Sequence, residues 1–143
     1  MIKHLCFLLS FGALATPALA AAQDTTRIDP SVSSVVTGGY WQQGQRGGRY
    51  RIVVRSAGFE HVSSTLRVEW ILEGTGKQDD SVLVSSAVDS IPDWLWSLDQ
   101  PDISCAARVC QFTIQGTEPH VLQKARWIIT LRDPGHLTVA KQR

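Results

Sequence analysis

Two cysteines, Cys105 and Cys110, are the residues whose type and spacing point most directly to chemistry. In an oxidising compartment an even pair of cysteines so close in sequence is typical of a disulfide. Closing so small a ring stabilises a fold by only about 2 kcal/mol, so its main use is local rigidity. We therefore predict a disulfide that closes the loop between these two residues.

The loop between the cysteines carries the leading candidate binding site. It presents one cation, Arg108, between the small apolar residues Ala107 and Val109. A rigid loop loses little conformational entropy on binding, which is how loop-insertion inhibitors place a side chain in a partner's cleft. Some bacterial periplasmic lysozyme inhibitors have a similar disulfide-closed loop, but the histidine expected from that group is missing here. The simpler alternative is a stapled β-hairpin whose arginine faces water.

Trp94 and Trp96 form a second candidate site, because alternate residues of a strand lie on the same face. Stacked indoles on a β-surface can hold sugar rings, so a glycan-binding module that recognises cell-envelope polysaccharide is the competing hypothesis. The alternative is structural. Large aromatic residues mostly fill cores, and a domain of this size needs Trp70, Trp127 and at least one of this pair for its core.

Signatures of catalysis and of metal binding are missing from the sequence. Glu60 and His61 lie side by side with serines nearby, but no Gly-x-Ser-x-Gly turn or comparable nucleophile signature accompanies them. Zinc would need two ligands beyond the cysteines, and His61, His120 and His136 lack the usual paired spacing. We expect no cofactor and no metal site, and an enzyme without a recognisable motif is only the third hypothesis.

The segment Gln42–Arg49, with Arg46 near its centre, superficially resembles glycine-arginine segments that bind nucleic acid. Removal of the first 20 residues takes away one base, Lys3, and no acid, so 13 basic and 13 acidic residues remain. A neutral chain has no long-range attraction for nucleic acid or for an anionic membrane. We expect this segment to be a flexible hairpin loop and a second edge for contact with a partner.

The N-terminus has the pattern of a cleaved secretory signal. A basic start precedes the apolar run Leu5–Leu14, and the triplet Ala18–Ala20, with a small residue at each end, then suits a cleavage site. The run is shorter than the roughly 20 residues that a membrane span needs, so we expect none. Residues 1–20 are then the signal peptide, 21–30 a flexible leader and 31–143 a single domain of a periplasmic or secreted protein.

Apolar and polar residues alternate in seven short segments, as in half-buried strands, and no stretch keeps a helical apolar period. Ile91–Leu98 is either an eighth strand, which we favour, or a helical turn begun by Pro92. The pattern predicts an antiparallel, immunoglobulin-like β-sandwich of about seven to eight strands, with a small closed β-barrel as the alternative. The seven segments are Val32–Trp41, Tyr50–Arg55, Leu66–Trp70, Val82–Val88, Gln111–Gln115, Ala125–Arg132 and Leu137–Ala140.

Charge is distributed unevenly, with an acidic middle segment, Glu69–Asp102, between two basic segments, Arg27–Arg67 and Ile103–Arg143. In a sandwich these segments interleave, so we favour cross-strand charge pairing over one functional patch. Together these features predict an exported, noncatalytic protein-interaction or inhibitor module, whose partner is an envelope or extracellular protein.

Overall fold

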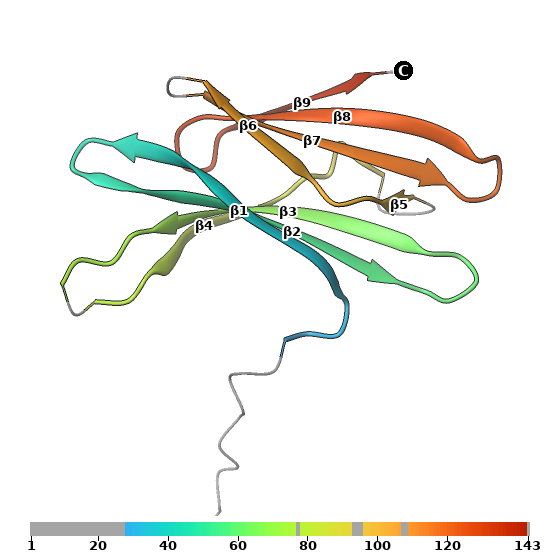
Figure 1. The fold of residues 1–143 in the computed structure, drawn as a ribbon, viewed down its shortest axis with the longest axis horizontal. Helices are drawn as coiled ribbons and strands as arrows, with labels where there is room; N and C mark the ends of the chain where they lie inside the picture. Colours follow the sequence, from blue (N-terminus) through green and yellow to red (C-terminus); the bar gives the residue numbers. More distant parts are fainter. Residues whose placement is uncertain (1–27, 77, 93–95, 107–108, 143) are drawn as a thin grey trace, which may run out of the picture.

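The structure is a computed structural model that describes residues 28–76, 78–92, 96–106 and 109–142. These residues form two antiparallel sheets that lie face to face (Figure 1). The first sheet has the order β1 (Val32–Gln43), β2 (Arg46–Ala57), β3 (Ser63–Leu72), β4 (Ser81–Ala87). In the second sheet, β7 (Val109–Glu118), β8 (Gln123–Leu131) and β9 (Leu137–Gln142) follow one another, while β5 (Ser97–Leu98) and β6 (Asp102–Ala106) both pair with the free side of β7.

The predicted β-sandwich is confirmed, and the sheets do not close into the barrel that was the alternative. Each predicted segment overlaps a strand, and where a predicted segment runs past its strand it does so by one residue. At Ile91–Leu98 the last two residues form β5, and residues 93–95 lie outside the described part of the chain. The chain crosses between the sheets once, after β4, because each sheet is built from strands consecutive in sequence.

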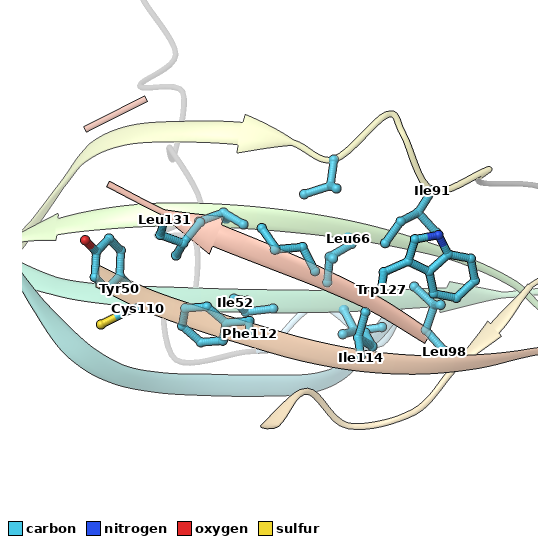
Figure 2. Close-up of a cluster of buried hydrophobic side chains, with 14 of the residues drawn as sticks. Tyr50, Ile52, Leu66, Ile91, Leu98, Cys110, Phe112, Ile114, Trp127 and Leu131 are labelled. Carbon is cyan, nitrogen blue, oxygen red and sulfur yellow. The ribbon is translucent and has the colours of Figure 1, made fainter. Parts of the chain in front are cut away.

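The core lies between the sheets and is built from the inward residues of the alternating strands. Tyr50, Ile52 and Val54 of β2 are no more than 1% exposed, and they face Phe112 and Ile129 of the other sheet, which are completely buried. Figure 2 shows side chains from both sheets meeting along the length of the sandwich. Alternation in the sequence therefore produces one continuous apolar layer.

Tryptophans supply much of the core volume, as the sequence predicts. Trp70 and Trp127 are fully buried, and Trp96 is 7% exposed with its ring edge-on to Trp127 at 4.9 Å between centroids. The indole of Trp70 and the phenol of Tyr50 both donate to the backbone carbonyl of Arg132, at 3.4 and 3.0 Å. These bonds satisfy the polar atoms of two large aromatic residues and tie the first sheet to the second.

Ser64 makes the second polar link between the sheets. Its side chain is 1% exposed, and its hydroxyl accepts from the amide of Leu98 at 3.3 Å. The Ser64 amide donates to the carbonyl of Trp96 at 3.0 Å. One small residue of β3 therefore holds the β5 segment as the chain enters the second sheet.

Ion pairs at or near the surface join the basic and acidic parts of the chain, as favoured from the sequence. Arg51 donates to Glu69 at 2.5 Å, and Arg49 pairs with Asp80. Both pairs connect the first basic segment with the acidic middle segment. Ion pairs near the surface contribute little to stability, so we expect them mainly to favour the observed pairing of neighbouring strands.

Replacement of Ser64 tests the link to β5. We expect Ser64→Ala to lower the free energy of unfolding by about 1–3 kcal/mol, because the buried Leu98 amide loses its acceptor. Urea unfolding measures the change, with Ser81→Ala as the control at an exposed serine of β4. Equal, small effects of the two substitutions would contradict this role of Ser64.

Candidate functional site

The predicted disulfide is present and joins two adjacent strands. Cys105 of β6 lies directly opposite Cys110 of β7, with 4.1 Å between their Cα atoms. Ala106 pairs with Val109, so the segment expected as a loop is the end of a stapled hairpin, which was the simpler alternative. The two intervening residues, Ala107 and Arg108, lie outside the described part of the chain.

The sulfur atoms of this disulfide pack against the backbone of β1 in the other sheet. A Cβ placed on Gly39 would lie 2.5 Å from Sγ of Cys110 and 2.8 Å from Sγ of Cys105. Gly39 also has φ +66°, a conformation that side chains other than glycine's disfavour. A glycine is therefore required here twice over, once by the backbone angle and once by the sulfur atoms.

A hollow opens beside the disulfide, between the β1–β2 hairpin and the turn after β8. Its cavity volume is about 740 Å³. Trp41 and Val109 form an apolar part of its wall. The exposed, charged residues Arg132 and Asp133 lie at its rim. The complete lining is Gly39, Tyr40, Trp41, Gln42, Tyr50, Cys105, Val109, Cys110, Arg132 and Asp133.

Tyr50 is neutral in the wall of this hollow. Burial raises the pKa of its phenol above the ordinary value, and the carboxylate of Asp133 raises it further. The phenol therefore stays protonated, and its O–H donates a hydrogen bond to the backbone carbonyl of Arg132. The charge that a ligand would meet here therefore comes from Arg132 and Asp133.

Tyr40 is the functional candidate that the sequence analysis missed. Its side chain is 53% exposed, lines the hollow beside the disulfide and also lines a second, smaller hollow on its other side. Arg46 and Glu73 border that second hollow. An aromatic residue in an uncharged edge strand, next to a glycine pair, was the only signal for it in the sequence.

The segment Gln42–Arg49 is ordered strand pairing, which corrects the expected flexible loop. Gln43 pairs with Arg46 and Gln42 with Gly47, so only the two residues between the strands form the turn. Gly44, with φ +62°, lets the chain reverse in so short a distance. Arg46 is exposed at this turn, on the same end of the sandwich as the disulfide hairpin.

The other predicted residues do not join this site. Trp96 lies in the core against Trp127, so its ring is not a surface platform, and Trp94 lies outside the described residues. Glu60 and His61 lie at the opposite end, between β2 and β3. Within the described ranges, no three or more His, Cys, Asp or Glu side chains are grouped to hold a metal ion.

No known protein family, curated protein or solved structure matches this chain. In the part of the chain that the structure describes, no helix is long and apolar enough to cross a membrane.

Two glycines test the contact between the disulfide and β1. Gly39 and Gly44 have nearly the same positive φ, but a Cβ on Gly44 would meet no atom within 4 Å. We expect Gly44→Ala to cost about 1–2 kcal/mol of unfolding free energy from the backbone alone. Gly39→Ala should cost clearly more, because the sulfur atoms must also move.

Chemical unfolding of both oxidised variants measures this difference. In a Cys105→Ala/Cys110→Ala background the excess cost of Gly39→Ala should shrink towards that of Gly44→Ala. Equal costs of the two glycine substitutions in the oxidised protein would show that the sulfur atoms do not restrict this position.

Proposed function

We propose that this protein is an exported, noncatalytic protein-interaction or inhibitor module. Its contact surface is the end of the sandwich formed by the disulfide hairpin, Tyr40 and the β1–β2 turn. Export is supported by the signal-like pattern of residues 1–20. The partner class is an envelope or extracellular protein.

The observation that carries the proposal is the packing of the disulfide on Gly39. The staple fixes β6 to β7, and its contact with β1 fixes the hairpin relative to the other sheet. A surface held in place from two sides loses little conformational entropy when a partner binds. Such rigidity in the paired strands of the hairpin benefits a protein that uses this end of the sandwich to bind a partner.

The composition of this end supports a protein partner. Exposed Tyr40 lies between two hollows, with Arg46 beside one and Arg132 beside the other. Tyrosine and arginine are enriched among the residues that dominate the energy of protein interfaces. The apolar wall beside the disulfide suits an apolar side chain of the partner, and Arg132 suits a carboxylate next to it.

Binding to a glycan receives less support from the described residues. A glycan platform would need Trp94 and Trp96 as an exposed pair, and Trp96 is a core residue. Tyr40 is the exposed aromatic residue at the hollow, and a single ring gives a small platform for a sugar.

Affinity capture with crosslinking from an envelope extract tests the proposal. We expect a specific protein partner whose affinity falls at least about tenfold for Tyr40→Ala, since truncation of an interface hot spot costs 2 kcal/mol or more. Arg108→Ala should weaken the same complex, as the sequence predicts. The melting temperature of Arg108→Ala should stay close to that of the wild type, which separates binding from folding.

Phe59→Ala is the matched control, because Phe59 is an almost fully exposed aromatic residue at the opposite end. It should leave capture unchanged. Equal capture by the wild type and by Tyr40→Ala would contradict the proposed surface. Capture of no specific protein would overturn the protein-partner proposal and direct the search to polysaccharides.

A further inference from the structure

Two histidines from different sheets meet at the end of the sandwich opposite the disulfide. His61 lies between β2 and β3, and His120 lies between β7 and β8; both of these connections lie on the right of Figure 1. Their ring centroids are 4.6 Å apart, and the ring planes are inclined by 36°. Both residues are exposed, so their rings are open to ions in solution.

We propose that His61 and His120 form a two-histidine site for a divalent transition-metal ion, with Cu²⁺ bound more tightly than Zn²⁺. Imidazole nitrogen is a good ligand for both ions, and the general order of affinity places Cu²⁺ first. The proposal is independent of the protein-binding surface, which lies at the other end of the molecule.

The separation of the rings suits one shared ion. A metal–nitrogen bond is about 2.0–2.1 Å, and a ring nitrogen lies roughly 1.1 Å from its ring centre, so two imidazoles on one ion have centres roughly 4.5–5 Å apart. The observed 4.6 Å lies in this range. Rotation of exposed side chains is enough to direct one nitrogen of each ring at a common point.

The loop that carries His120 is fixed by a carboxylate. Glu118 accepts from the amide of His120 at 3.1 Å and from the amide of Val121 at 2.8 Å. Glu118 is therefore a positioning residue, which holds the backbone of one ligand. Such supporting contacts orient metal ligands and strengthen binding.

The loop that carries His61 is restricted by a glycine. Gly58 has φ +98°, and a Cβ on it would lie 2.2 Å from the carbonyl oxygen of His61. The glycine thus allows the chain to turn closely around the histidine. Glu60, the neighbour of His61 in sequence, contributes a second carboxylate to this end of the molecule.

The two histidines supply two coordination positions, and water fills the others, as at open metal sites. Among the described His, Cys, Asp and Glu residues no third ligand joins the pair. The 58 residues between positions 61 and 120 explain why sequence spacing did not predict the pair. Only the packing of the two sheets brings the loops together.

Titration of the untagged, metal-free protein with CuCl₂ and with ZnCl₂, followed by calorimetry, tests the proposal. We expect saturable binding of one ion per chain, tighter for Cu²⁺. His61→Gln and His120→Gln should each weaken the binding by at least about tenfold, since each removes one of two ligands. His136→Gln is the control, because His136 is exposed near the disulfide end and should leave binding unchanged.

Electron paramagnetic resonance of the Cu²⁺ complex gives a second readout, with coupling to two imidazole nitrogens expected in the wild type and to one in each single variant. Thermal unfolding without metal checks that the variants are folded. Absence of saturable binding would overturn the proposal. Binding that is the same in the wild type and in both His61→Gln and His120→Gln, or that is lost in His136→Gln, would overturn it as well.

Discussion

The contact between the Cys105–Cys110 disulfide and the backbone of Gly39 sets how closely the two sheets approach at one end of the sandwich. β1 and β6 lie at the edges of different sheets, and the apolar core ends between them. A side chain at position 39 would occupy the volume of the sulfur atoms. Because interiors are close-packed, the cross-link and the glycine depend on each other.

The architecture of the candidate site follows from this contact. Because β1 is held against the disulfide hairpin, the hollow lies between β1 and the turn after β8, and Tyr40 lines it. The carbonyl of Arg132 accepts from both Tyr50 and Trp70, which ties that turn to the first sheet. A surface assembled from three segments is thereby fixed before any partner arrives, and this rigidity is what the proposed function uses.

Much of the fold could be predicted from the sequence. Apolar residues at every second position indicate that a segment is a strand, and they also indicate which of its faces is buried. Tyr50, Ile52 and Val54 illustrate this directly. The disulfide could be predicted because two cysteines so close in sequence have few other partners in an oxidising compartment. The strand β6 was not among the predicted segments, although Asp102, Ile103, Ser104 and Cys105 alternate between polar and apolar residues; its pairing with β7 identifies it as a strand.

The candidate sites were less accessible, because they depend on contacts between segments far apart in sequence. Trp96 reads equally well as a surface platform or as a core residue, and the position of Trp127 decides between them. The contact of Gly39 with the sulfur atoms can be predicted only when it is known that the edge strands β1 and β6 of the two sheets lie together. The same holds for His61 and His120, which belong to different sheets.

Amide hydrogen exchange of the oxidised protein, compared with the protein after reduction of the disulfide, tests the central claim most directly. We predict that reduction lowers protection in β6 and β7 near the cysteines and also in β1 and β2 around Gly39 and Tyr50, although those strands contain no cysteine. Protection near Ser64, at the other end, should stay the same. A loss of protection confined to β6 and β7 would contradict the account, because it would show that the disulfide rigidifies its own hairpin without holding the two sheets together.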